Sequence, residues 1–255
     1  MTEQLFFETI GDGIPLILLH GYPLDHSIWQ EVAAGLKNEA RIIMPDLRGQ
    51  GKSPAPAGTY LMEDLAGDIL QILDKLNIEK TIIAGHSMGG YVALALAKIH
   101  PERLSGLALV ASHAYADSAE KKKARLDSIE RIKREGVQPI LAPMAEKLSK
   151  DPSVVDRCRA LAASASAQGI IGTLAGLAAR EDMADVFFGL EIPTMMISGM
   201  EDQINPPSVN REMARGLKSS WLVEIEGAGH MPMLEKPEQV IQAFKSFILT
   251  IKEKA

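Results

Sequence analysis

The sequence predicts an α/β fold: a mostly parallel central sheet flanked by helices, with a helical insertion before the last strands. Short apolar runs alternate with amphipathic stretches along the chain, which is the pattern of repeated β-α units. Most of these runs are apolar throughout, as expected of strands that are covered on both faces. The stretch 114–189 breaks the rhythm, because it contains helical patterns and no convincing strand.

Each expected strand is a short apolar run between turn or helix signals. The opening strand, for example, is followed by the turn residues Gly11-Asp12-Gly13. The expected strands are Leu5–Ile10, Leu16–His20, Arg41–Met44, Thr81–Ala84, Gly106–Ala111, Thr194–Ser198 and Trp221–Ile225.

Helices of suitable length lie between these strands. Leu61–Leu76 carries its apolar residues in a helical stripe, so we expect one buried face. Met88–Ile99 is apolar nearly all round, which predicts a buried helix that ends before Pro101. Glu238–Ile251 is expected to form the final helix.

The stretch 114–189 is expected to form a cap over the edge of the sheet. Its predicted helices are Ala119–Gly136, Val137–Ser149 and Pro152–Ala167, and the charge run Glu120-Lys121-Lys122-Lys123 is expected to be a solvated helix face. The chain then divides into a first part of the core (1–113), the cap (114–189) and a second part of the core (190–255).

Composition narrows the class of protein. The 255 residues are 46% hydrophobic and 24% charged, as in soluble globular proteins. The net charge of −6, without an obvious basic patch, argues against a nucleic-acid partner. The single cysteine, Cys158, has no partner for an intrachain disulfide or a zinc site. The N-terminus, Met1-Thr2-Glu3-Gln4, lacks the basic region of a secretory signal, and no apolar run approaches the roughly 20 residues that span a bilayer. We therefore expect a cytoplasmic protein without a membrane partner.

The candidate nucleophile is Ser87, in the motif Gly85-His86-Ser87-Met88-Gly89. A predicted strand precedes the motif and a predicted helix follows it, so the serine lies on an abrupt turn that exposes its hydroxyl. Side chains at Gly85 and Gly89 would clash where strand and helix crowd together. The positive end of the helix dipole also faces charge that develops beside Ser87.

A serine hydroxyl needs a base to take its proton, and the candidate base is His230. It follows the last strand on a loop next to Gly229, which fits the order serine, acid, histidine along the chain. The ring of His86 is expected to point away from Ser87, and His20 is expected to organise the loop that follows it.

The acid that orients the base should stand at the end of another strand. Asp202 fits, because it comes just after the run Thr194–Ser198. Glu201 on the same loop is the alternative.

Two backbone N–H groups are needed to bind the oxyanion of a tetrahedral intermediate. The first belongs to Met88, directly after the nucleophile. The second is expected from the loop after Gly21, at Tyr22 or, as the less favoured alternative, Leu24, since Pro23 has no N–H.

One motif suggests a different class of protein. Gly49-Gln50-Gly51-Lys52-Ser53 ends like a phosphate-binding loop, but that loop needs a glycine where Asp46 stands. The third glycine of a dinucleotide-binding pattern is also missing, because Pro54 occupies its position. We therefore reject a nucleotide-binding function.

Five motifs stand in one order along the chain: Leu18-Leu19-His20-Gly21-Tyr22-Pro23, the run 46–53, the run 85–90, Gly199-x-x-Asp202 and Gly229-His230. In this order they resemble the α/β-hydrolase superfamily, and within it small serine esterases and 3-oxoadipate enol-lactonase-like proteins. The resemblance implies a catalytic triad of Ser87, Asp202 and His230, an oxyanion hole formed by the Tyr22 and Met88 amides, and no metal or cofactor. A serine nucleophile argues against the dehalogenases and epoxide hydrolases of the superfamily, which use aspartate.

The sequence therefore predicts hydrolysis of a small carboxylic ester or lactone through an acyl-enzyme. The alternatives are C–C bond hydrolysis or perhydrolysis by the same triad, and a low-turnover ligand-binding receptor on the same fold. An enol-lactonase would have to bind a free carboxylate, for which an arginine is best suited. The arginines of the cap region that we considered are Arg125, Arg131, Arg157 and Arg180, and its candidate apolar lining residues are Met144, Leu148 and Leu161.

Overall fold

The predicted sheet is present and has seven strands. They are β1 (Phe7–Ile10), β2 (Ile14–Leu19), β3 (Ala40–Pro45), β4 (Thr81–His86), β5 (Leu104–Val110), β6 (Thr194–Gly199) and β7 (Ser220–Ile225). Their order in the sheet is β1-β3-β2-β4-β5-β6-β7. Only the first pair, β1 with β3, is antiparallel. This computed structural model describes residues 4–217 and 220–254. The first three residues, Met1, Thr2 and Glu3, belong to the segment in which we expect no secretory signal, and they lie outside the described residues.

The strand ends differ by up to two residues from those expected. The largest extension at the functional edge is in β4, which continues through Gly85 and His86. These two residues pair with Leu109 and Val110 of β5, so the sheet holds them extended although neither is a strong strand former. The turn that carries the candidate nucleophile therefore begins directly at Ser87.

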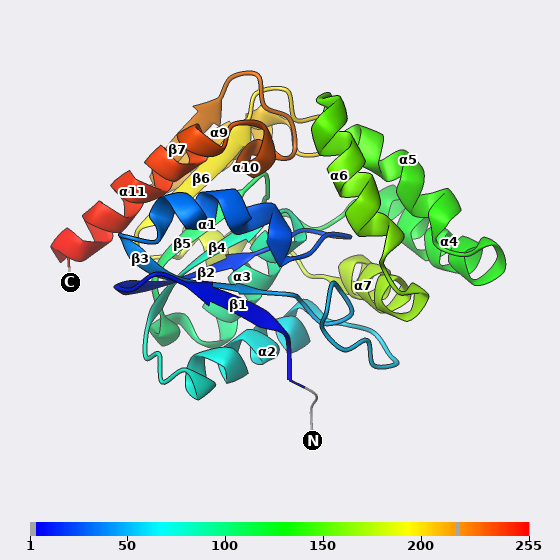
Figure 1. The fold of residues 1–255 in the computed structure, drawn as a ribbon, viewed down its shortest axis with the longest axis horizontal. Coiled ribbons are helices and arrows are strands. Elements are labelled where there is room, and N and C mark those ends of the chain that lie inside the picture. The colour runs from blue at the N-terminus through cyan, green and yellow to red at the C-terminus, as the bar shows by residue number, and fades with distance from the viewer. Residues whose placement is uncertain (1–3, 218–219, 255) are drawn as a thin grey trace.

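Two layers of helices cover the sheet (Figure 1). α1 (Gln30–Leu36) and α11 (Pro237–Lys254) lie on one face, and α2 (Met62–Lys75) and α3 (Met88–Ile99) lie on the other. Successive side chains of a strand alternate between the faces, so Ile82 packs in the core under α1 and α11 while Ile83 packs under α2 and α3. This explains why the central strands are apolar at most positions.

Between β5 and β6 the chain forms helices and no strand, as expected. We call these helices the insertion: α4 (Ala119–Glu135), α5 (Gln138–Leu148), α6 (Pro152–Ala163), α7 (Ala167–Ala179) and α8 (Ala184–Phe188). Figure 1 shows α4 to α7 gathered at one side of the sheet. The domain boundaries at 113/114 and 189/190 remain a prediction.

The expectation of one helix over Pro152–Ala167 is wrong at its end. α6 stops at Ala163, and α7 begins after Ser166, whose hydroxyl accepts a hydrogen bond from the Gly169 N–H at 2.9 Å. The sequence pattern did not predict α7, because the helix contains glycines and glycine disfavours helices. They permit close docking instead: a Cβ at Gly176 would lie 1.6 Å from the carbonyl oxygen of Tyr60.

Several short elements were not foreseen either. They are α1, α8, α9 (Pro207–Gly216), α10 (Pro232–Glu235) and two 3-10 helices, η1 (His26–Trp29) and η2 (Pro101–Arg103). Among the described residues, no single helix is long and apolar enough to cross a membrane. Only when α6 and α7 are taken together do they reach the length and apolar composition of a membrane-spanning segment, and they are bent by 106° relative to each other.

Candidate active site

Ser87 lies on the turn between β4 and α3 in a backbone conformation that is rare for residues other than glycine, with φ 50° and ψ −112°. The turn is as crowded as expected. A Cβ at Gly85 would lie 2.2 Å from the carbonyl carbon of Gly89, and a Cβ at Gly89 would lie 2.6 Å from the Leu19 oxygen. The strain and the two glycines together hold the serine out from the backbone at the end of the strand.

The structure brings His230 and Asp202 together. The imidazole Nδ1 lies 2.8 Å from Asp202 Oδ2, and the side chains are 3% and 0% exposed. The other oxygen, Oδ1, accepts hydrogen bonds from the N–H groups of Ile204 and Asn205 at 2.8 and 2.9 Å. A carboxylate only accepts hydrogen bonds, so Nδ1 carries a proton, and in the neutral imidazole Nε2 keeps its lone pair. His230 is thus arranged to take a proton through Nε2. It is on a loop, as expected, but it is buried.

Glu201, the alternative acid, lies elsewhere. Its carboxylate is exposed and pairs with Lys150 of the insertion at 2.8 Å. No interaction joins it to His230. Of the two acids considered, only Asp202 contacts the imidazole.

The N–H groups of Tyr22 and Met88 have no acceptor among the described residues. By contrast, the N–H of Leu24 donates to the Gly21 oxygen at 3.0 Å. The loop lies directly against Ser87, because a Cβ at Gly21 would be 3.2 Å from the Ser87 Cβ. The geometry therefore favours Tyr22 over Leu24 as the second oxyanion donor.

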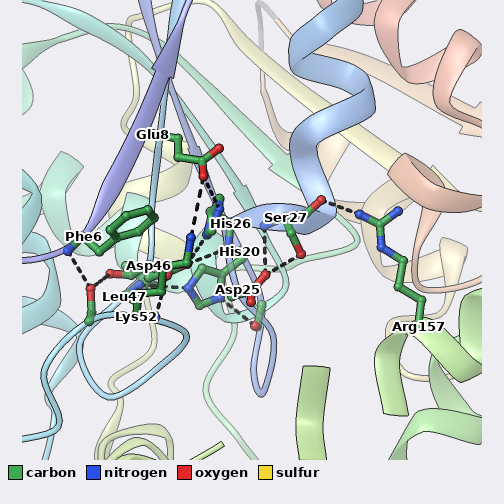
Figure 2. Close-up of polar contacts among 12 residues, drawn as sticks. Phe6, Glu8, His20, Asp25, His26, Ser27, Asp46, Leu47, Lys52 and Arg157 are labelled. Atoms are coloured by element: carbon green, nitrogen blue, oxygen red, sulfur yellow. Dashed lines mark hydrogen bonds and ion pairs between the residues drawn. The ribbon is translucent and has the colours of Figure 1, made fainter. Parts of the chain in front are cut away.

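His20 fixes the orientation of that loop, as expected (Figure 2). Its Nε2 accepts the Leu47 N–H at 2.9 Å, so the proton is on Nδ1, which donates to the Gly21 oxygen at 2.9 Å. Burial lowers the pKa of His20 and keeps the ring neutral, as the accepting nitrogen requires. Because the C=O and N–H of a trans peptide point in opposite directions, the held Gly21 carbonyl turns the Tyr22 N–H away from His20.

His86 is a site residue that the sequence interpretation missed. Its Nε2 lies 2.8 Å from the His230 backbone oxygen, and the two rings are 4.9 Å apart between centroids. Burial, followed by the proximity of His230, lowers its pKa well below the usual value, so it stays neutral. His86 therefore packs against His230 and supports its backbone without adding charge. No sequence signal other than its place next to Ser87 points to this role.

Ser112 and Asn205 connect the nucleophile turn with the loop of the acid. The Ser112 hydroxyl donates to the Ser87 backbone oxygen at 2.7 Å, and the Asn205 amide group donates to the Ser112 oxygen at 3.0 Å. Asn205 also donates its own N–H to Asp202. The two contacts of Ser112 join residues far apart in the chain, which is why sequence patterns did not reveal them.

Asp25, His26 and Asp46 form the one group among the described residues whose ligand atoms lie close enough for a metal. Their polar atoms already have partners in the chain (Figure 2): Asp46 Oδ1 accepts from the His26 N–H and lies 2.6 Å from its Nδ1, while Oδ2 accepts from the Lys52 N–H. The glycine-rich run 49–53, which looked like a phosphate loop, thus wraps around Asp46. A Cβ at Gly51 would lie 2.3 Å from Asp46 Oδ2.

A cavity of about 300 Å³ lies between Tyr22 and the insertion. Its apolar walls include Ile140, Met144 and Leu174. Its charged lining residues are all cations, namely Lys121, Arg125 and Lys147. Of the apolar lining residues considered from the sequence, Met144 is present here, while Leu148 is buried in the core.

Of the four cap arginines considered from the sequence, only Arg125 lines this cavity. Arg180 is buried against Asp117 at 2.9 Å, and Arg157 donates to the Ser27 oxygen at 2.6 Å. Arg131 pairs with Glu135 on the surface. Lys121, expected on a solvated face, is 44% exposed but lies 3.5 Å from Asp117 Oδ1, so that expectation is only partly right.

The profile of the α/β hydrolase fold matches residues 14–134 and 142–237. The chain belongs to this family. A Bacillus subtilis (strain 168) protein of the AB hydrolase superfamily is 30% identical over 95% of this chain and 94% of its own length. The 3-oxoadipate enol-lactonase 1 of Acinetobacter baylyi is 30% identical, covering 89% of this chain and 86% of its own. A thermophilic esterase from Thermogutta terrifontis, solved with malate bound, has 37% identity and a TM-score of 0.94 over 97% of this chain and 93% of its own. These similarities support hydrolase activity.

His113 of this α/β hydrolase is partly buried near the insertion, where its Nε2 lies 3.2 Å from the Tyr91 hydroxyl. Burial, followed by the nearby charge of Arg180, lowers its pKa from 6.5 to about 4. Between these values the unfolded chain binds a proton that the folded hydrolase does not, so stability falls as the pH falls from 6.5 to 4. The shift corresponds to about 3 kcal/mol at most.

The variant His113→Gln should lose part of this pH dependence, because glutamine can still reach the Tyr91 hydroxyl but does not titrate. We expect its unfolding free energy, measured by urea denaturation, to fall less steeply than that of the wild-type hydrolase between pH 6.5 and 4. The variant should keep some dependence of its unfolding free energy on pH, because the pKa values of His20 and His86 are also lowered. Identical slopes in the two proteins would contradict the assignment.

Proposed function

We propose that this α/β hydrolase cleaves a carboxylic ester or lactone through an acyl-enzyme on Ser87. The observation that carries the proposal is the buried bond from His230 Nδ1 to Asp202, which leaves Nε2 able to accept a proton. It is supported by the ring contact of His230 with His86, the direct neighbour of Ser87.

The proposed reaction has two halves. Ser87 Oγ attacks the carbonyl carbon while His230 Nε2 takes the hydroxyl proton, and Asp202 stabilises the imidazolium that results. The N–H groups of Tyr22 and Met88 bind the oxyanion, and each such donor contributes about 10²- to 10³-fold to kcat. His230 returns the proton to the leaving oxygen, and water then releases the acyl group by the same steps. In a lactone the leaving oxygen stays attached to the acyl group.

The cavity beside Tyr22 supports an acyl group that ends in a carboxylate. Lys121, Arg125 and Arg180 surround Asp117, so three cations face one carboxylate and the cluster carries a net charge of +2. Only the Nε of Arg125 is used by Asp117, and its terminal nitrogens have no partner among the described residues. The names of two relatives point the same way, because one is a 3-oxoadipate enol-lactonase and the other binds malate.

Matched esters test this function. We expect turnover of p-nitrophenyl butyrate, of p-nitrophenyl hydrogen glutarate and of a simple lactone, with the carboxylated ester preferred. Faster cleavage of a β-diketone than of any ester would instead favour the alternative of C–C bond hydrolysis, and activation of peroxide would favour perhydrolysis. Tight binding of these compounds without turnover would favour the ligand-binding receptor.

The variant Arg125→Met should lower kcat/KM for the carboxylated ester by roughly 10- to 100-fold, the value of a hydrogen bond between charged groups. Its kcat/KM for the neutral ester should change little. Lys123→Met is the matched control, because Lys123 is 74% exposed on the same helix and pairs with Asp127. Equal losses on both esters, or an equal effect of the control, would contradict the carboxylate assignment.

A further inference from the structure

The loop that carries His230 is held by three consecutive backbone N–H groups. The N–H groups of Gly229 and Met231 donate to Oε2 of Glu235 at 2.8 and 3.2 Å. Between them, the N–H of His230 donates to the backbone oxygen of Leu148 at 3.0 Å. The base therefore sits between two anchors, one carboxylate at the end of α10 and one carbonyl at the end of α5.

The same carboxylate connects this loop to the insertion. Glu235 Oε1 accepts a hydrogen bond from the Ser149 hydroxyl. Ser149 Oγ in turn accepts the Asp151 N–H at 3.0 Å, where α6 begins. One glutamate thus joins the backbone on both sides of His230 to the junction between α5 and α6.

Two further contacts join the α5–α6 junction to this region: the His230 N–H donates to the Leu148 oxygen, and Lys150 pairs with Glu201 on the Asp202 loop. A polar cavity of about 120 Å³ separates the α5–α6 junction from the base loop, and both Glu235 and His230 line it. Glu235 is half-buried and has no ion-pair partner among the residues that the structure describes. Burial raises the pKa of its carboxyl, and the hydrogen bonds from Ser149 and the two amides offset this rise only in part. Its oxygens are therefore committed to this loop and to the insertion.

We propose that Glu235 is a positioning residue that holds His230 in register with Asp202, and that through Ser149 it makes this alignment depend on the docked insertion. The proposal rests on the proposed function, in which His230 is the base. If Glu235 is lost, two amides and one hydroxyl lose their acceptor, and of the three loop N–H groups only that of His230, bonded to Leu148, keeps one. Displacements of about 1 Å in a catalytic group can lower a rate by 10²-fold.

The test compares Glu235→Leu with Glu235→Gln. In the glutamine variant the remaining amide oxygen can still accept the Gly229 and Met231 N–H groups, while its NH₂ group faces Ser149 Oγ, which can accept. We expect Glu235→Leu to lower kcat by about 10- to 100-fold with KM changed less than about threefold, and Glu235→Gln to restore kcat to within about threefold of wild type. Glu238→Gln, an exposed change three residues away, should have no effect.

A spectroscopic measurement separates positioning from general damage. The proton between His230 Nδ1 and Asp202 should give a low-field ¹H NMR signal, identified by its loss in His230→Gln, because His26 and Asp46 form a similar bond. We expect the signal in wild type and Glu235→Gln, and its loss or broadening in Glu235→Leu. Wild-type kcat in the leucine variant, no rescue by glutamine, or an unchanged signal in folded Glu235→Leu would overturn the proposal.

Coupling to the insertion has its own test. Ser149→Ala should lower kcat by itself, yet add little to Glu235→Leu, because both changes remove the same bond. Independent, additive effects would overturn the link to the insertion. A wild-type protein that hydrolyses no ester would contradict the proposed function instead, and the NMR signal would still decide whether Glu235 positions His230.

Discussion

Replacing Ser87 with alanine is expected to lower kcat for ester hydrolysis by on the order of 10⁴- to 10⁶-fold while the protein stays folded. The substitution removes the only atom that forms the acyl-enzyme. Alanine keeps the Cβ of serine and adds no atom, so it should introduce no new steric contact in the turn, where φ is 50°. The measurement is the steady-state rate on p-nitrophenyl butyrate, with circular dichroism to confirm folding.

The matched control for this change is Ser164→Ala. Ser164 is exposed in the insertion and donates its hydroxyl to the Leu161 oxygen, so its loss should leave kcat unchanged. A small residual rate in Ser87→Ala is expected from the oxyanion donors, which can still stabilise attack by water. Retention of more than about one hundredth of the wild-type kcat would contradict Ser87 as nucleophile.

The second large effect is expected for Asp202→Asn, which should lower kcat by about 10⁴-fold. The asparagine oxygen can still accept the Ile204 and Asn205 N–H groups, so the loop should keep its shape. Its NH₂ group would then face His230 Nδ1 and favour the tautomer with the proton on Nε2. In that tautomer the imidazole can no longer accept the serine proton.

Glu201→Gln provides the comparison, because Glu201 is the neighbouring acid on the same loop and pairs only with Lys150 on the surface. Exposed pairs of this kind contribute little to stability. We expect wild-type kcat in this variant. A large loss of kcat in Glu201→Gln and a small loss in Asp202→Asn would indicate that Glu201, and not Asp202, is the acid that orients His230.

The sheet and its principal helices could be predicted because their pattern is local. Strands that are buried on both faces are apolar at most positions, and Met88–Ile99 is recognisable by the same burial. α7 could not be predicted in this way. Its glycines weaken the local helical signal, and their reason lies in the approach of α7 to the backbone near Tyr60.

The candidate site divides in the same way. Ser87, Asp202 and His230 each follow a strand, so their order along the chain is enough to indicate their roles. The residues that support them do so across long separations in sequence. His86 contacts the His230 backbone, and Ser149 contacts Glu235, and neither pair has a local signal. The choice between Tyr22 and Leu24 likewise depended on which N–H already had an acceptor.

The central claim is that Ser87 is a nucleophile activated by His230, and covalent labelling with a fluorophosphonate tests it most directly. The account predicts one adduct per chain, located by peptide mass spectrometry on Ser87, and no adduct in Ser87→Ala. Labelling should also be slow in His230→Gln, because the serine then lacks its base. An adduct on a different residue, or an active esterase that takes no label, would contradict the account.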